Sequence, residues 1–298
     1  MRVVVAGGTG LLGRALIPRL EADGHIITIL SRTPRGPREV AWHPDGTAGE
    51  WASALDGTDA LINLTGASIS EGRWTPDRKA VIDSSRVHPT RSLSNAIGQL
   101  SRPPAVFISG SAVGYYGPCG DEALTEDSPA GTDFLAGVCN QWEWEAQVAS
   151  KWTRVVLLRT GLVLHPTGGA LPQIVRPFRF YAGGPMGSGQ QYWSWIHIDD
   201  WVEMVCWALR AEPLDGALNV TAPNPVRNRE FAAAVGAVLH RPSWLPTPGA
   251  ALRIVLGEMA DALLLNGQRV LPARAEWSGY TFRHPELLPA LHALLDAR

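Results

Sequence analysis

The amino-acid sequence predicts an α/β protein with a doubly wound parallel sheet and a smaller, mostly helical C-terminal region. A β-branched run at residues 2–6 stops at a glycine cluster, and an apolar helical pattern begins directly after it. Further short apolar runs alternate with helical patterns and lie at residues 26–30, 60–66, 105–109 and 153–158. This alternation is typical of βα units in a parallel sheet, whereas the chain beyond Leu164 changes character and ends in helices.

The composition fits a globular enzyme and excludes several other classes. Of the 298 residues, 45% are apolar and 18% are charged, and the formal net charge is −2. This balance gives no sign of a basic nucleic-acid-binding surface, and no run of about 18 apolar residues would span a membrane. The three cysteines are widely spaced and match no zinc or disulfide framework. We therefore expect a cytoplasmic protein with reduced thiols and no metal, nucleic-acid or membrane partner.

The glycine cluster at residues 7–13 is the pattern on which the functional prediction depends. It reads GGTGLLG and lies between a strand pattern and a helix pattern, the context that a dinucleotide-binding turn requires. The first glycine permits a sharp turn, the second leaves room for a pyrophosphate, and the third lets helix and strand pack closely. Free N–H groups at the helix N-terminus favour phosphates. The expected cofactor contacts here are Gly7, Thr9, Gly10, Leu11, Leu12 and Gly13.

The end of the second predicted strand, residues 26–30, selects the cofactor. An acidic residue there would accept the ribose 2′-hydroxyl of NAD, whereas a basic group with small hydroxyl donors suits a 2′-phosphate. The chain has Ser31-Arg32-Thr33 and no carboxylate nearby. Arg32 can pair with the phosphate and stack on the adenine, so NADP is expected with Ser31 and Arg32 as contacts; a solvated loop arginine is the alternative.

Two more regions are expected to border the cofactor. Leu64, Thr65 and Gly66 end the strand over 60–66, and ligands of doubly wound sheets lie outside the carboxyl ends of strands. Ser109 ends the strand over 105–109 and is a candidate for the same reason. Arg86 falls on a helix predicted from about 75 to 100, where it would either reach the dinucleotide or form a surface ion pair.

The other elements follow in order. A Pro- and Gly-rich stretch with a possible edge strand at 39–42 comes first, and helix patterns follow at 134–151, 170–178, 228–239, 250–265 and 285–295. Residues 190–195 alternate like a strand. His197 then opens a helix with Asp199 and Asp200 at its N-terminus, where carboxylates are favourable. His197 and Asp199 would also suit a metal site or a dyad, but we expect a structural role.

Four segments together resemble the extended short-chain dehydrogenase/reductases, the branch that holds nucleotide-sugar epimerases and dehydratases. They are GGTGLLG at 7–13, SGSAVGYYG at 109–117, LRTGLVL at 158–164 and GSGQQYWSWIHIDDWV at 187–202. More narrowly, the chain resembles the atypical group called epimerase family proteins. The resemblance implies a Rossmann NADP-binding domain at 1–165 to which 190–222 returns. A smaller substrate or cap region would comprise 166–189 and 223–298.

The sequence departs from that superfamily at the catalytic signature Tyr-x-x-x-Lys. Phe134 and Val138 have the required spacing on the expected helix but neither function. Ser111 occupies the place of the hydroxyl residue that hydrogen-bonds the reacting oxygen. Tyr116 and Tyr115 follow it and are the other catalytic candidates, although the wider family has a structural Tyr-Gly in this segment.

A tyrosine needs a positive neighbour to act near neutral pH, which the nicotinamide or Arg159 would supply. Glu143 and Glu145 on the same helix are expected to be solvated or ion-paired.

Two functional hypotheses follow. The first is an NADP(H)-dependent oxidoreductase or epimerase-like enzyme that acts on a small carbonyl, hydroxyl or nucleotide-sugar substrate, as a monomer or homodimer. The alternative is a catalytically silent NADP(H)-binding redox sensor or regulatory protein. The missing Tyr/Lys pair favours the second, and a C-terminal half that forms a cleft favours the first.

Overall fold

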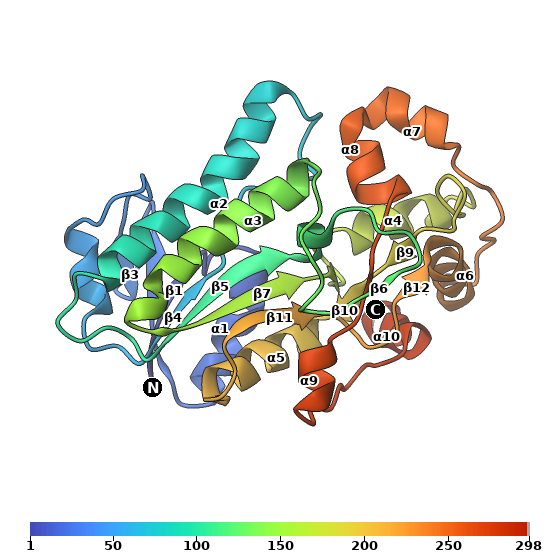
Figure 1. Cartoon of the computed structure of the whole chain (residues 1–298). Coiled ribbons are helices and arrows are strands. Elements are labelled where there is room, and N and C mark those ends of the chain that lie inside the picture. Colours follow the sequence, from blue (N-terminus) through green and yellow to red (C-terminus); the bar gives the residue numbers. More distant parts are fainter. Residues whose placement is uncertain (297–298) are drawn as a thin grey trace.

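A seven-stranded parallel sheet forms the centre of the molecule. The computed structural model describes residues 1–296, and its strands are β1 (Arg2–Ala6), β2 (Ile26–Ser31), β3 (Glu39–Ala41), β4 (Ala60–Asn63), β5 (Val106–Ala112), β7 (Arg154–Thr160) and β11 (Gly216–Val220). Their order is β11-β7-β5-β4-β1-β2-β3 (Figure 1). The order reverses at β1, between β4 and β2, and in open sheets of this kind ligands bind outside the carboxyl ends of the strands at such a point. The doubly wound fold class predicted from the sequence is confirmed.

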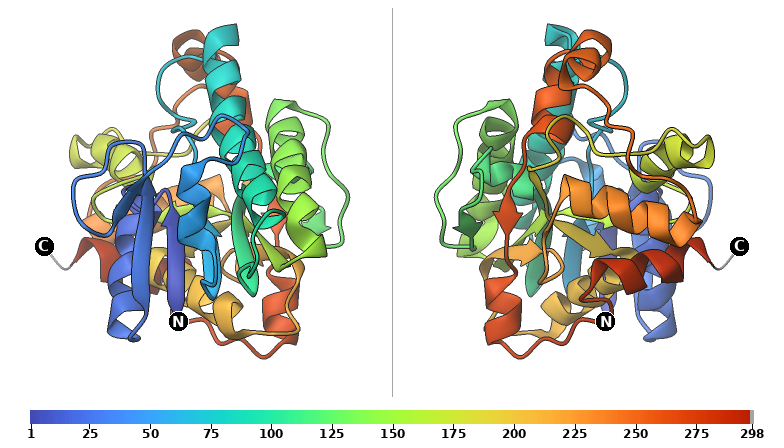
Figure 2. Two further views of the ribbon diagram at one scale, coloured as in Figure 1. Left: turned by 90° about the vertical axis from the view of Figure 1, so that its left-hand side faces the viewer. Right: turned by 90° about the vertical axis from the view of Figure 1, so that its right-hand side faces the viewer.

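Four helices cover the two faces of the sheet in pairs. One pair is α1 (Leu11–Ala22) and α5 (Ile198–Arg210), and the other is α2 (Pro76–Ile97) and α3 (Phe134–Gln147) (Figure 2). Val3 and Val5 of β1 belong to the core shared with α1 and α5, whereas Val4 and Ala6 belong to the core shared with α2 and α3. Because both faces are buried, the strand has an unbroken apolar sequence instead of an alternating one.

The rest of the described chain forms short helices and three two-stranded ladders. The helices are α4 (Leu171–Arg179), α6 (Asn228–Leu239), α7 (Gly249–Leu256), α8 (Glu258–Ala260), α9 (Ala273–Trp277) and α10 (Leu287–Leu295), with 3₁₀ turns at 50–55, 113–116 and 148–151. The ladders pair β8 (Leu162–Leu164) with β10 (Trp195–His197), β9 (Tyr192–Trp193) with β12 (Val226–Arg227), and β6 (Ala123–Leu124) with β13 (Arg269–Val270). Among residues 1–296, no helix is both long enough and apolar enough to cross a membrane.

Two predicted elements differ from the observed ones. The helix expected at 250–265 is broken into α7, α8 and a π-helical turn at 261–265, because Gly257 has a φ of +64° and ends α7. The strand expected at 190–195 is interrupted at Ser194, whose hydroxyl donates to the carbonyl of Gln268 (2.7 Å). The helix at 228–239 has the predicted bounds.

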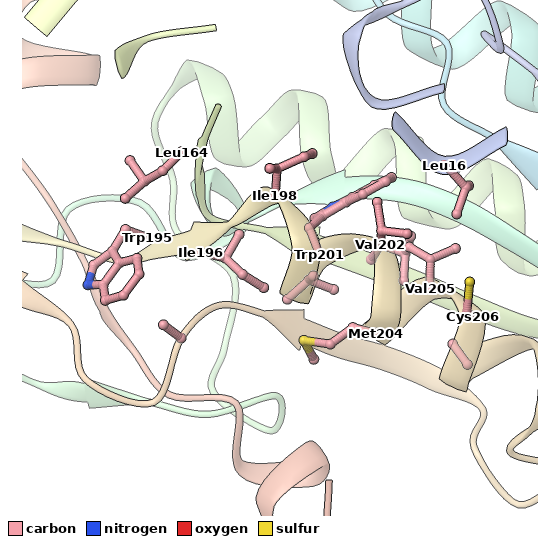
Figure 3. Close-up of a cluster of buried hydrophobic side chains, with 14 of the residues drawn as sticks. Leu16, Leu164, Trp195, Ile196, Ile198, Trp201, Val202, Met204, Val205 and Cys206 are labelled. Atoms are coloured by element: carbon pink, nitrogen blue, oxygen red, sulfur yellow. The ribbon is translucent and has the colours of Figure 1, made fainter. Parts of the chain in front are cut away.

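Helix α5 is held tightly in the core (Figure 3). Trp195 and Trp201 are completely buried, and Trp201 packs with Val205 and with Leu16 of α1. The Nδ1 atom of His197 accepts the backbone N–H of Asp199 (3.0 Å) and so caps this helix. These two tryptophans are therefore part of the hydrophobic core.

A buried carboxylate joins the sheet to the C-terminal region. Glu126 is 5% exposed and accepts the backbone N–H of Asn219 in β11 (3.0 Å). It also accepts the N–H of Arg274 in α9 (3.3 Å), close to the ladder between β6 and β13. Burial raises the pKa of Glu126, and the two backbone N–H donors lower it in part.

Candidate functional site

The glycine turn between β1 and α1 leaves its open space at Gly10. Gly7 has a φ of +80°, and a Cβ there would lie 2.7 Å from the backbone of Leu64. A Cβ at Gly13 would lie 2.5 Å from Gly8, so both positions need glycine for the chain to pack. A Cβ at Gly10 would meet only the Gly7 carbonyl oxygen, at 3.3 Å. The turn therefore has room for a ligand at Gly10 and none at the other two glycines.

The N-terminus of α1 is free to bind an anion. Gly10 is its N-cap and offers no side-chain acceptor, and no acidic residue lies in the first turn. Thr9 is exposed, whereas Leu11 and Leu12 are half-buried. The first N–H groups of α1 and its dipole therefore face a place where phosphate oxygens would be stabilised.

The predicted residues after β4 lie beside this turn. Leu64 donates its N–H to the Ala6 carbonyl (2.8 Å), which extends the sheet pairing by one residue. The Thr65 hydroxyl donates to Asn63 Oδ1 (2.6 Å), which fixes the backbone before Gly66. Ser109, by contrast, is completely buried within β5. The structure thus places residues 64–66 at the carboxyl edge of the sheet, with Ser109 beneath the surface.

Ser31 and Arg32 lie at the end of β2, where the adenosine ribose of a dinucleotide would lie in this fold. Ser31 is half-buried and Arg32 is exposed. The Ser31 hydroxyl accepts the N–H of Thr33 (3.3 Å), which leaves its own proton available. Within residues 1–296 Arg32 forms no ion pair, so its charge is open to a ligand.

Arg86 of α2 lies against the segment after β4 and has no carboxylate partner in the described part of the chain. Its guanidinium donates to the carbonyls of Ile82 (2.8 Å) and Ala67 (3.0 Å) and lies 5.5 Å from the ring of Trp142. Burial lowers its pKa from the usual value. The surface ion pair that was the alternative for Arg86 is absent there, and the cation remains available to an anionic ligand.

Ser111, at the carboxyl end of β5, is the first member of a buried polar network. Its hydroxyl donates to Glu143 Oε1 of α3 (2.6 Å). Arg159 of β7 holds the same carboxylate with Nε (2.9 Å) and Nη2 (2.8 Å). Burial lowers the pKa of Arg159, but the hydrogen bonds to Glu143 and Tyr116 and the charge interactions with both groups together raise it by more, so the guanidinium is charged. Glu143 is ion-paired, as expected, and so is Glu145, which binds Arg91 (2.6 Å).

Tyr116 extends this network, and its hydroxyl has both a donor and an acceptor. Tyr116 is 1% exposed, donates to Asn219 Oδ1 (2.7 Å) and accepts from Arg159 Nη1 (3.0 Å). Burial raises its pKa to about 12, although Arg159 acts in the opposite direction. This arrangement favours the structural alternative for Tyr116. Tyr115 is half-exposed, and its ring stacks on the Arg159 guanidinium at 3.4 Å.

Tyr116→Phe is expected to destabilise the protein by about 1–3 kcal/mol, because Asn219 and Arg159 each lose a buried partner. Equilibrium unfolding in urea measures this change. A proton-donor role would instead appear as a 10²–10⁴-fold loss of turnover on a true substrate without a matching loss of stability.

Phe134, at the sequence position where the superfamily has its catalytic tyrosine, packs among apolar side chains. Phe134 packs edge-to-face with Trp74 (5.3 Å) in a cluster that includes Met259 of α8. Lys79 lies 4.9 Å from the Phe134 ring and donates to Glu258 (2.6 Å). The segment α7–α8 thereby lies over the start of α2 (Figure 1). The sequence did not predict this position of α7 and α8, because it depends on contacts between residues far apart in the chain.

The histidine cluster near α5 fits a structural role. Ligand atoms of His197, Asp199 and His284 lie within 4.8 Å of one another, close enough for a metal ion. However, His197 Nδ1 already accepts the Asp199 N–H, and the two imidazole rings stack at 3.8 Å with an angle of 24°. Lone pairs in two nearly parallel planes do not converge on one ion, so the geometry is poor for a metal.

Two cavities lie away from the glycine turn. One of about 590 Å³ is lined by residues at the amino ends of β5 and β7, at the edge of the sheet opposite to the glycine turn. The other, of about 400 Å³, lies between the loop 118–121, residues 190–191 and residues 265–267. Arg227 lines it, pairs with Asp121 (2.9 Å) and stacks on Tyr192 (4.6 Å). No sequence motif pointed to Arg227 or Asp121.

The sheet order and the glycine turn define a dinucleotide-binding protein of the Rossmann class. The chain belongs to the NAD dependent epimerase/dehydratase family, whose family model matches residues 3–221. Residues 247–294, which begin just before α7, match a domain of unknown function, DUF1731. The resemblance inferred from the four sequence segments is confirmed.

Relatives match nearly the whole chain. Epimerase family protein SDR39U1 of Homo sapiens is 39% identical over 298 residues, which cover 99% of this chain and 100% of the relative. The chloroplastic homolog of Arabidopsis thaliana is 42% identical over 99% of this chain and 87% of its own length. A crystal structure of human SDR39U1 (isoform 2) with NADPH has a TM-score of 0.93 and 38% identity, with 100% of both chains covered.

Proposed function

We propose that the chain is an NADP(H)-dependent oxidoreductase or epimerase-like enzyme that acts on a small carbonyl, hydroxyl or nucleotide-sugar substrate. The observation that carries the proposal is the open space at Gly10, next to the free N-terminus of α1 and at the same edge of the sheet as Ser31 and Arg32. The NADPH in the structure of the human relative supports the choice of cofactor.

The proposed cofactor site follows the carboxyl edge of the sheet. The pyrophosphate would lie against Gly10 and the first turn of α1, and the 2′-phosphate between Ser31 and Arg32. Residues 64–66 would border the cofactor next to the pyrophosphate site, with Arg86 as the nearby cation. A bound nicotinamide would supply or accept a hydride, while the protein binds, orients and excludes water.

The proposed division of the chain assigns residues 1–165 and 190–222 to nucleotide binding. Residues 166–189 and 223–298 would cover the substrate. Helices α7 and α8 lie entirely in that second part, and the cavity beside Arg227 is lined in part by its residues. Ser111, Tyr115 and Tyr116 remain the candidate catalytic hydroxyls, and Tyr115 is the most exposed of the three. A cytoplasmic monomer or homodimer is part of the same proposal.

Arg32→Ala is expected to weaken NADPH binding by roughly 2–5 kcal/mol, because the 2′-phosphate loses a charged partner. Titration of NADPH and NADH into wild type and variant, followed by nicotinamide fluorescence, measures the loss. Arg35→Ala removes another exposed charge three residues away and is the matched control. Equal affinity of the wild type for NADPH and NADH would contradict the assignment.

A catalytically silent NADP(H) sensor is the second candidate, and a specific observation favours it. Phe134 is packed in an apolar cluster where the superfamily has its tyrosine, and the hydroxyl proton of Tyr116 is committed to Asn219. The two candidates differ in NADPH consumption across panels of carbonyl compounds and nucleotide sugars. Tight NADPH binding without consumption on either panel would support the sensor.

A further inference from the structure

The direction of the hydrogen bond between Ser111 and Glu143 is fixed by charge. Glu143 is 6% exposed and Arg159 is 4% exposed, and two N–H groups of the guanidinium bind the two carboxylate oxygens. A buried guanidinium beside a neutral acid would be left without compensation, so the carboxylate is ionised. An ionised carboxylate only accepts hydrogen bonds, and the proton between the two side chains therefore belongs to Ser111.

This commitment changes what Ser111 can offer to a ligand. A serine hydroxyl has one proton and two lone pairs, and the proton is already used in a short, charge-assisted bond of 2.6 Å. Only lone pairs remain for any group that reaches Ser111 from the carboxyl end of β5. The bond to a negative carboxylate also places extra electron density on Oγ, which strengthens it as an acceptor.

The neighbouring hydroxyl does not relieve this restriction. Tyr116 accepts from Arg159 and donates to Asn219 Oδ1, and the Asn219 Nδ2 group donates to the Leu271 carbonyl (2.9 Å). That last bond fixes which side of the amide is the acceptor. The Tyr116 proton is therefore also committed, and the network presents no free proton at the end of β5 through Ser111 or Tyr116.

We infer that Glu143 and Arg159 make Ser111 a hydrogen-bond acceptor only, so that the substrate group held there is a donor, such as an alcohol hydroxyl or an amine. A carbonyl or ether oxygen would face lone pairs and leave both groups unsatisfied. The inference rests on the proposed function, because it takes the carboxyl end of β5 as the reacting edge. Glu143 and Arg159 are positioning residues in this assignment, since they act through Ser111.

The test compares two probes on the protein saturated with NADPH, where an alcohol is inert. Affinities of 1-phenylethanol and of its methyl ether, which accepts but does not donate, are measured by saturation-transfer NMR titration. The wild type is expected to bind the alcohol roughly 10–100-fold more tightly, the usual cost of an unmet polar pair. Ser111→Ala should reduce this preference to about threefold or less. Ser111→Thr, which keeps the hydroxyl, should retain it.

Glu143→Gln tests the positioning role, because it removes the charge that holds the Ser111 proton. The preference for the alcohol should fall, while NADPH affinity stays close to that of the wild type. Glu145→Gln is the matched control: it lies on the same helix, is as deeply buried and is paired to Arg91 instead. If Glu143→Gln does not fold, the Ser111 pair of variants still decides the question.

Three outcomes would overturn the inference: equal affinity of the wild type for both probes, tighter binding of the ether, or binding of neither. A preference that survives in Ser111→Ala would also overturn it, because the donor would then meet another group. In each of these cases normal NADPH binding leaves the proposed function standing. Failure of NADPH to bind the wild type would instead remove the proposed function.

Discussion

Gly10→Val is expected to lower NADPH affinity by about 100-fold or more, ~3 kcal/mol, in a protein that still folds. Gly10 has a φ of −76° and a ψ of 178°, which a branched residue adopts without strain. Its Cβ would meet only one carbonyl oxygen, at 3.3 Å. The added methyl groups would therefore occupy the space proposed for the pyrophosphate, and the packing would have to adjust only by a few tenths of an ångström at the Gly7 carbonyl. Fluorescence titration gives the affinity, and thermal unfolding gives the stability.

Two other glycines serve as comparisons for this variant. Gly13→Val should prevent folding or reduce stability severely, because its Cβ would overlap Gly8 at 2.5 Å. Gly137 lies on α3, and a Cβ added there would have nothing within 4 Å. Gly137→Ala should therefore lower neither NADPH affinity nor stability. Normal NADPH affinity in folded Gly10→Val would place the dinucleotide elsewhere on the molecule.

Glu143→Ala is expected to lower the free energy of unfolding by about 3–5 kcal/mol, the usual cost of removing one partner of a buried ion pair. The variant leaves the Arg159 guanidinium buried without a counter-charge and removes the acceptor of Ser111. Urea denaturation of the purified variant measures this loss of stability, provided that the m-value is the same as in the wild type.

Glu145→Ala is the control for burial and helix position. Its partner Arg91 has a side chain that is 42% exposed, against 5% for Arg159. Water can solvate the Arg91 charge once the carboxylate is gone, so the loss should be clearly smaller. Similar losses in the two variants would mean that the network around Arg159 has no special stabilising role.

The elements that the sequence predicted best are those whose signal is local. The strand at 2–6 and the helix at 228–239 agree with the observed bounds, because apolar periodicity and flanking residues determine them. The glycine turn was predictable for the same reason, since each of Gly7, Gly10 and Gly13 has its own steric role. The break at Gly257 was missed, because helical periodicity continues through it.

The parts of the site that could not be predicted depend on partners distant in sequence. Ser111, Glu143 and Arg159 come from β5, α3 and β7, and only the assembled fold brings Ser111 and Arg159 within 3 Å of Glu143. Reading Tyr116 as an available hydroxyl did not take into account Asn219, which lies 103 residues later. The direction of a proton in such a network follows from burial and charge, which a residue pattern alone does not contain.

The bonds of Glu126 to Asn219 and Arg274 also determine when the molecule can become native during its synthesis. A ribosome would have completed all seven central strands well before the backbone N–H of Arg274 emerged. Until then Glu126 would keep access to water, and β6 would have no β13 to pair with. The nascent sheet would therefore wait for residues 269–274 before Glu126 had all of its hydrogen-bond donors and β6 had its partner strand. A stop codon shortly before residue 269 should yield a chain that aggregates or is degraded, even though its glycine turn is intact.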